Sequence, residues 1–170
     1  MLMHDIRPHI PAPFADPGTV LYVGYRPDAC AWLQELAEAG NTITVLEVWP
    51  ANITGALGVE KNVSRFWLGD VRQVDQIPGT WDYVWYWHGP EHIWPEEFPG
   101  VLEKLKAKAR RLVAVAAPWG EYEQGPHEGN VAETHRWSVY EEDLEALGMD
   151  VVTDGERDRE GSEIVGWVGV

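Results

Sequence analysis

The polar residues best suited to chemistry directly follow an aromatic run. Residues 81–87 (WDYVWYW) are predicted to form a buried strand, and His88 comes next, followed by a Gly89-Pro90 turn and then Glu91-His92. Open α/β sheets bind their ligands at the carboxyl ends of their strands. A histidine at such a strand end can act as a general base near neutral pH. His88 is therefore the candidate catalytic residue, with a structural hydrogen-bonding role as the alternative.

Two upstream segments could hold a nucleoside beside this strand. Residues 19–23 (TVLYV) form an apolar run ahead of Gly24, and residues 42–47 (TITVLE) form a β-branched run that ends on Glu47. The order strand, glycine turn, helix, strand, acid is the one with which a Rossmann-like sheet binds an adenosine ribose. A carboxylate suits this role because its two oxygens can accept from both ribose hydroxyls. Glu47 is predicted to bind ribose, and a solvated strand-end acid is the alternative.

Hydrophobic patterning and turn residues divide the chain into strands and helices. Strands are expected at residues 19–23, 42–48, 63–68, 81–87, 112–116, 150–153 and 163–168, and helices at residues 29–39, 51–57, 96–109 and 140–147. The early alternation of strands and helices predicts a parallel sheet with right-handed crossovers. The short polar link at residues 154–161 predicts that the last two strands form an antiparallel hairpin. The expected fold class is α/β: a Rossmann-like, seven-stranded, mostly parallel sheet with an antiparallel last strand and helices on both faces.

The chain is expected to hold one domain, residues 19–170, preceded by an arm. Residues 1–18 contain four prolines. Proline disfavours helix for itself and for the residue before it, so this segment is predicted to be an extended, proline-rich N-terminal arm. The arm would cover either the sheet edge or a pocket.

The composition is acidic, with a formal net charge of −15. That charge argues against nucleic acid as a partner, because phosphate binding needs clustered Lys and Arg. One basic cluster, at residues 104–111, is predicted to be a solvated helix face. No apolar run is long enough for a membrane span and no signal-peptide pattern is present, so a cytoplasmic, soluble protein is expected. The ten tryptophans are expected mainly in the core, with a ligand cleft or a homo-oligomer interface as alternatives.

The segment from Pro118 to Arg136 lacks periodicity and is expected to form a loop over the carboxyl end of the sheet. Such a loop is a candidate lid that recognises a small-molecule substrate. Its expected substrate-binding residues are Trp119, Tyr122, His127 and His135. The acidity of the loop favours a cationic or hydroxyl-rich substrate.

Metal and cysteine chemistry receive little support from the sequence. The lone cysteine, Cys30, excludes an internal disulfide and is predicted to fill the core. A metal site of His127, Glu128 and His135 is conceivable, but these residues match no recognised ligand spacing. The sequence therefore predicts no metal, and solvated loop polarity is the favoured interpretation.

The order of these segments resembles that of the class I S-adenosylmethionine-dependent methyltransferases, over about residues 19–170. The similar segments are Val20-Leu21-Tyr22-Val23-Gly24 (first motif), Leu46-Glu47-Val48-Trp49-Pro50 (acidic end of the second strand), Gly69-Asp70-Val71 (adenine side), Trp81-Asp82-Tyr83-Val84 with Glu91-His92-Ile93 (fourth motif), and His135-Arg136-Trp137-Ser138 ahead of residues 141–148 (fifth-to-sixth crossover). The resemblance implies S-adenosylmethionine as the cofactor and methyl transfer to an oxygen or nitrogen of a small molecule.

The resemblance also implies a set of cofactor contacts. They are Gly24, Tyr25, Arg26, Glu47, Val48, Trp49, Gly69, Asp70, Val71, Trp87 and His88. Asp70 would accept from the adenine amino group or, alternatively, cap a helical turn at residues 71–76. Arg26 is a candidate contact for the methionine carboxylate.

The first motif departs from the family pattern, which is acid-x-Gly-x-Gly-x-Gly. Tyr22 stands at the acidic position, and Arg26 and Asp28 stand at the later glycine positions. Glycines there let the backbone approach a cofactor closely. An alternative interpretation is therefore a catalytically decayed methyltransferase-like domain with a binding or assembly role. A nicotinamide-type Rossmann enzyme is a weaker third alternative, because its glycine fingerprint is absent too.

Overall fold

The structure, a computed structural model, describes residues 7–10, 12–27, 31–56 and 61–170. Its elements, in chain order, are β1 (Thr19–Val23), α1 (Ala31–Glu38), β2 (Thr42–Glu47), α2 (Pro50–Ala56), β3 (Val63–Leu68), η1 (Val71–Gln76), β4 (Trp81–Trp87), η2 (Pro90–His92), α3 (Phe98–Lys108), β5 (Ala109–Pro118), η3 (Val131–Glu133), α4 (Glu141–Glu145), β6 (Asp150–Asp154) and β7 (Glu163–Gly169). Among these residues no helix has the length and apolar character needed to cross a bilayer. Asp28 and Cys30, which the sequence analysis considered, lie outside the described residues.

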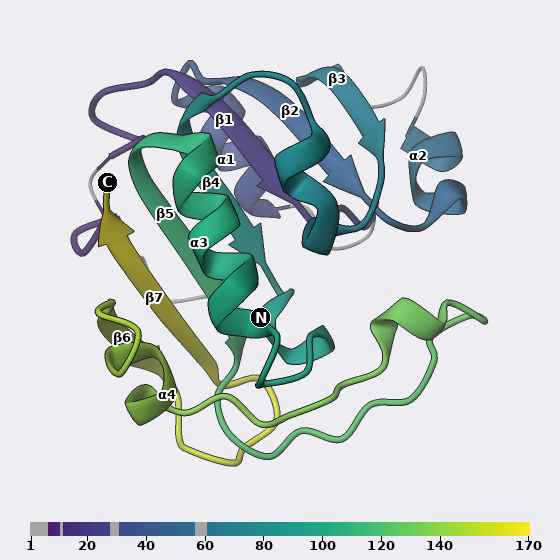
Figure 1. The fold of residues 1–170 in the computed structure, drawn as a ribbon, viewed down its shortest axis with the longest axis vertical. Helices are drawn as coiled ribbons and strands as arrows, with labels where there is room; N and C mark the ends of the chain where they lie inside the picture. Colours follow the sequence, from purple (N-terminus) through teal and green to yellow (C-terminus); the bar gives the residue numbers. More distant parts are fainter. Residues whose placement is uncertain (1–6, 11, 28–30, 57–60) are drawn as a thin grey trace.

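The strands form one seven-stranded sheet in the order β3-β2-β1-β4-β5-β7-β6. Strands β1 to β5 pair in parallel, and β7 runs antiparallel to both β5 and β6. The five parallel strands end at the lower edge of the sheet, and the long segment after β5 runs along that edge (Figure 1). The predicted fold class is confirmed, including the closing antiparallel hairpin.

Helices cover both faces because the central strands are apolar on both sides. On one face Trp85 and Trp87 of β4 stack with ring centroids 5.4 Å apart and pack against Trp32 of α1. On the other face Val84 and Tyr86 of β4 belong to a core that includes the buried side of α3. The alternation of aromatic side chains along β4 therefore builds both cores.

The described part of the N-terminal arm covers a face of the sheet. Ile10 is fully buried, and the Phe14 ring packs against Trp32 and Trp85 with centroids 5.8 and 6.0 Å apart. These residues join the core on the face of the sheet that also packs against α1.

The basic cluster at residues 104–111 does not form a single helix face, as the sequence suggested. Helix α3 ends at Lys108, and β5 begins at Ala109, opposite Trp81 of β4. Arg110 and Arg111 therefore lie on β5, where they pair with Asp82 and Asp16. Strand pairing with β4 and β7 extends β5 beyond the predicted residues 112–116.

A polar clasp joins the first residues of β1 and β4, at the edge opposite the strand ends that hold the candidate site. The Thr19 backbone amide and hydroxyl both donate to Asp82 Oδ2 at 2.8 Å, and the Asp82 amide donates back to the Thr19 hydroxyl at 3.0 Å. The bonds from Thr19, together with Arg110, hold the pKa of Asp82 below its usual value. The charged carboxylate therefore stabilises the folded state.

We expect Asp82→Asn to lower the free energy of unfolding at pH 7 by about 1–2 kcal/mol, because it removes a charged acceptor of two hydrogen bonds. A group with a lowered folded-state pKa contributes fully above its unfolded pKa of about 4 and loses that contribution as the pH falls through the folded value. Urea unfolding at pH 7 and pH 3 should therefore show a smaller penalty at pH 3. The exposed Glu96→Gln serves as the control, and an equal penalty at both pH values would contradict the account.

Candidate functional site

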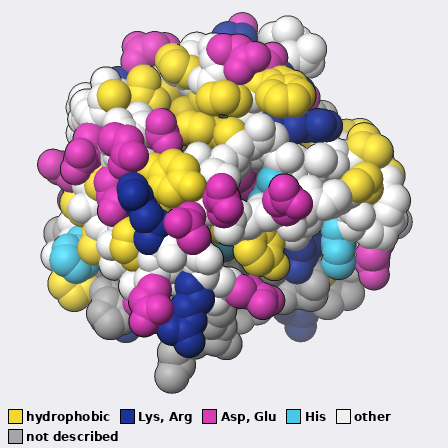
Figure 2. Space-filling model, turned by 90° about the horizontal axis from the view of Figure 1, so that it is seen from below, with side chains coloured by type: hydrophobic (Ala, Val, Ile, Leu, Met, Phe, Trp, Pro, Cys, Tyr) yellow, Lys and Arg dark blue, Asp and Glu magenta, His cyan; other side chains and the backbone are white. Residues whose placement is uncertain are grey.

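Two adjoining cavities open where the parallel strands end. Their volumes are about 320 Å³ and about 350 Å³, and both are lined by Gly24, Glu47, His88, His92 and Glu133. The strand order reverses between β1 and β4, which is where open α/β sheets bind ligands. Figure 2 looks onto this edge of the molecule and shows acidic side chains over much of it. The first cavity extends toward β7, and the second extends toward the ends of β2 and β3.

The backbones that follow β1 and β4 approach each other closely. Gly24 has a φ of +81°, and a Cβ built on it would lie 3.2 Å from the carbonyl oxygen of Trp87. His88 also adopts the left-handed region, with a φ of 46°. A non-glycine residue in this region is strained by about 1–2 kcal/mol. The strain falls on the candidate catalytic residue at the boundary between the cavities.

Glu47 ties the ends of β1 and β2 together. Its carboxylate accepts from the backbone amides of Tyr25 and Trp49, both at 2.7 Å, and from the Asn52 side chain at 3.3 Å. The residue is 4% exposed, and burial raises the pKa of its carboxyl although these donors oppose the shift. A carboxylate offers about four acceptor positions, so Glu47 retains capacity for at least one ligand hydroxyl.

The second cavity gathers the residues expected on the adenine side. Val48, Gly69, Asp70 and Val71 line it together with Glu47. The Asp70 side chain accepts from the amide of Arg72 at 2.8 Å and caps η1. The capping alternative for Asp70 is therefore confirmed, and the residue still borders the cavity.

His88 lies between two carboxylates. Its Nε2 is 2.9 Å from Glu163 at the start of β7, and its Nδ1 is 3.5 Å from Glu91. Burial opposes protonation of the ring, but the contacts with Glu163 and Glu91 outweigh this effect and raise the pKa of His88 to about 10. The sequence predicted a base that titrates near neutral pH. The two carboxylates instead favour the protonated imidazole, and the contact of Nε2 with Glu163 fits the hydrogen-bonding role that the sequence left as the alternative.

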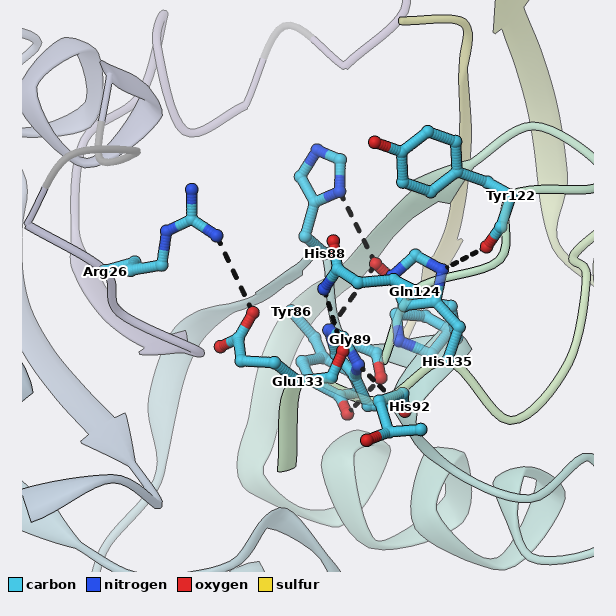
Figure 3. A network of polar contacts seen from close by, with 12 residues as sticks. Arg26, Tyr86, His88, Gly89, His92, Tyr122, Gln124, Glu133 and His135 are labelled. Carbon is cyan, nitrogen blue, oxygen red and sulfur yellow. Dashed lines mark hydrogen bonds and ion pairs between the residues drawn. The ribbon is translucent and has the colours of Figure 1, made fainter. Parts of the chain in front are cut away.

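Glu91, His92 and His135 form a second polar cluster under His88. Glu91 is 2% exposed. The rings of His92 and His135 lie 5.0 Å apart, and Figure 3 shows them close together beside the strand end that carries His88. Burial lowers the pKa of His135, which favours its neutral form.

The long loop after β5 closes over both cavities. The Arg136 amide donates to the carbonyl of Glu91 at 2.7 Å, and the Trp137 indole donates to the carbonyl of Pro90 at 2.7 Å. Glu133 of the same loop pairs with Arg26 at 3.7 Å, as Figure 3 shows. The loop is therefore fixed to η2 and to the segment that follows β1.

The structure brings together most of the predicted site residues. Those that line one or both cavities are Gly24, Tyr25, Arg26, Glu47, Val48, Gly69, Asp70, Val71, Trp87, His88, Tyr122 and His135. Three predicted residues line neither cavity. Trp49 contributes its amide to Glu47, the Trp119 indole donates to Glu141 at 2.8 Å, and His127 is exposed.

Sequence reasoning missed three acids that shape the site. Glu163 is 5% exposed and is the first residue of β7. The sequence signal that could have identified it is an acid directly before an apolar run. Glu91 was quoted for its motif and not recognised as a buried charge. Glu133 was assigned only to a solvated loop, and no local pattern predicts its pairing with Arg26, a residue more than 100 positions away.

Comparison with solved structures identifies the architecture. TehB from Haemophilus influenzae aligns with a TM-score of 0.67 at 12% identity, over 98% of this chain and 61% of its own, so this chain spans about three fifths of TehB. An S-adenosylmethionine-dependent methyltransferase from Archaeoglobus fulgidus aligns with a TM-score of 0.62 at 18% identity, over 96% of this chain and 91% of its own. The N-terminal domain of EvdMO1, whose structure was determined in the presence of SAH and D-fucose, aligns with a TM-score of 0.68 at 18% identity, over 96% of this chain and 80% of its own.

The chain has the fold of the class I S-adenosylmethionine-dependent methyltransferases. No protein-family model matches the sequence, and no curated protein matches it significantly. Within this methyltransferase fold the degenerate first motif keeps Gly24, where a Cβ would lie 3.2 Å from the carbonyl oxygen of Trp87 in β4.

We expect Gly24→Ala to lower the free energy of unfolding by about 1–2 kcal/mol, because alanine is strained at positive φ and its Cβ would press on the Trp87 carbonyl. Gly100→Ala is the matched control. Gly100 lies within α3 with open space around its Cα, so alanine there should raise stability by about 0.5–1 kcal/mol. Urea unfolding of the two variants measures both effects, and a Gly24→Ala protein as stable as the parent would contradict the close approach of these backbones.

Proposed function

We propose that this protein transfers a methyl group from S-adenosylmethionine to an oxygen or nitrogen of a small molecule. One observation carries the proposal. Glu47 lines both cavities, near the point where the strand order of the sheet reverses. The cavity on one side of it extends to the end of β3, and the cavity on the other side extends past His88 toward β7. A nucleoside and a second reactant therefore have separate and adjacent places.

The residues around the second cavity fit the adenosine part of the cofactor. Glu47 has acceptor capacity for a ribose hydroxyl, and Val48, Asp70 and Val71 surround the place beyond it. When bound, the cofactor supplies a methyl group already activated on a sulfonium. The protein has mainly to align the two reactants and exclude water.

The first cavity fits a cationic or hydroxyl-rich acceptor. Besides Glu47, four glutamates line it: Glu91, Glu133, Glu160 and Glu163. Tyr122 and Gln124 add polar groups from the loop. Such a lining favours positive charge and hydrogen-bond donors over a phosphorylated acceptor.

His88 has the position to contact the acceptor. It borders both cavities, and Glu163 holds its Nε2 at 2.9 Å. The ring can orient the acceptor atom toward the sulfonium carbon. When that atom carries a proton, the groups near His88 that can accept it are the carboxylates that flank the ring.

A binding or assembly role without methyl transfer is the second candidate. The observation that favours it is the bulky Tyr25-Arg26-Pro27 segment, whose Arg26 pairs with Glu133 at 3.7 Å beside the cavities. In the family, glycines occupy this region. Cofactor binding separates the two candidates directly.

For Glu47 we expect calorimetric titration of the parent protein with S-adenosylmethionine and S-adenosylhomocysteine to show micromolar binding. Glu47→Gln should weaken it at least tenfold, because one charged acceptor for ribose is lost. Glu145→Gln, an exposed acid on α4, should bind like the parent. Absence of binding by the parent at millimolar ligand would favour the binding or assembly role.

For His88 we expect His88→Ala to keep S-adenosylmethionine affinity within about threefold and to slow turnover by about 10². Turnover is measured as S-adenosylhomocysteine release with an acceptor found by screening cationic and polyhydroxylated compounds. His127→Ala is the matched control, since His127 lines neither cavity. A large loss of cofactor affinity with unchanged turnover at saturation would contradict the assignment.

A further inference from the structure

We infer that Glu91, His92 and His135 form a binding site for one divalent transition-metal ion in the floor of the first cavity. One ligand atom from each of these side chains can be chosen so that all lie within 4.8 Å of one another. Ligand atoms that bind one ion at about 2.1 Å lie roughly 3–4 Å apart, so small side-chain adjustments complete the site. The three residues come from η2 and from the loop after β5.

The buried Glu91 carboxylate indicates that a cation belongs here. The residue is 2% exposed, and among the described residues neither of its oxygens has a hydrogen-bond partner. Its nearest ring nitrogens are His88 Nδ1 at 3.5 Å and His92 Nε2 at 3.8 Å, both beyond good hydrogen-bond length. A buried carboxylate without hydrogen bonds is costly, and these two long ion pairs offset that cost less than a directly bound ion would. A bound ion would satisfy it.

Both histidines are oriented as metal ligands usually are. His135 Nδ1 lies 2.6 Å from the carbonyl oxygen of Tyr122, and His92 Nδ1 lies 3.4 Å from the carbonyl oxygen of Thr134. A carbonyl oxygen can only accept, so the short contact of His135 favours a proton on Nδ1 and a lone pair on Nε2, and the longer contact of His92 points the same way. Ligating histidines commonly have this second contact, which fixes the tautomer and the ring direction.

The backbone holds the two ligand segments together before any ion binds. The Arg136 amide donates to the carbonyl of Glu91 at 2.7 Å, and the His135 amide donates to the carbonyl of Gln124 at 2.9 Å. The Trp137 indole donates to the carbonyl of Pro90 at 2.7 Å. The bonds from Arg136 and Trp137 join this loop to η2, and the bond from His135 holds the loop against its own residue 124, so the site requires little reorganisation.

The ligand set and its surroundings indicate which ion fits. Two imidazoles and one carboxylate suit Zn²⁺, Co²⁺, Fe²⁺ or Mn²⁺ better than Mg²⁺ or Ca²⁺, which prefer oxygen ligands. Glu133, Glu160 and Glu163 also line the cavity and attract a cation. Three protein ligands leave coordination positions free toward the cavity.

The position of the site also suggests a class of methyl acceptor, an inference that rests on the proposed function. Glu91, His92 and His135 line the cavity assigned to the acceptor, next to His88. An acceptor with two neighbouring oxygen atoms, such as a vicinal diol or a hydroxycarbonyl compound, can occupy the free coordination positions. Its reacting oxygen would then lie within the cavity that His88 borders.

The test uses the full chain, freed of metal with a chelator and titrated with Co²⁺, whose visible spectrum reports coordination by histidine and carboxylate. We expect one equivalent to bind at micromolar concentration or below, with competition by Zn²⁺. Glu91→Gln and His135→Ala should each weaken binding at least tenfold. His127→Ala, on the same loop and outside both cavities, should bind like the parent.

Circular dichroism of each apo variant establishes that it is folded, and His92→Gln provides a second, less disruptive test if His135→Ala is not. The folded parent is titrated at metal concentrations 100-fold below those at which ions bind non-specifically to its surface. Absence of saturable Co²⁺ or Zn²⁺ binding under these conditions would overturn the site. Equal binding by the ligand variants and by His127→Ala would overturn it as well. S-adenosylmethionine affinity is measured separately on the same samples, so cofactor binding without metal binding rejects this site and leaves the proposed function standing.

Discussion

The close passage of β1 and β4 at their carboxyl ends is the constraint on which the rest of the site depends. Between these strands the sheet order reverses, so the chain leaves β1 toward one face and leaves β4 toward the other. Gly24 provides the space for this passage, and His88 accepts backbone strain beside it. Glu47 then ties the segment after β1 to the end of β2 through two backbone amides. Both cavities open around this junction.

Charged side chains from several elements meet at this junction. Glu91 and Glu163, from different elements, place their carboxylates on either side of His88. The loop after β5 is bonded to η2 by backbone and indole hydrogen bonds, which brings His135 to His92. Buried acids and histidines that converge in a cavity are a common mark of functional sites. Burying these charged and polar side chains without a ligand costs free energy of folding, and a purely structural role would not explain that cost.

The strand order and helix placement could be predicted because their signals are local. Each signal can be recognised from a few neighbouring residues: the aromatic run of β4, the glycine after β1 and the acid at the end of β2. Side-chain pairing across the loop could not be predicted, because Arg26 meets Glu133 and Glu91 meets His135 only after the loop after β5 has folded back. The contact of His88 with Glu163 could not be predicted for the same reason, since Glu163 lies 75 residues away. Arg110 and Arg111 were misplaced because strand pairing overrode their helix propensity.

The central claim is that the Glu47 side of this crevice holds a nucleoside and the His88 side holds the reacting atoms. A crystal structure of the protein with S-adenosylhomocysteine tests it most directly. The account predicts ribose density within hydrogen-bond distance of Glu47, adenine beside Val48 and Asp70, and the sulfur atom directed toward His88. Density for the ligand elsewhere on the molecule, or a sulfur atom directed away from the first cavity, would contradict it.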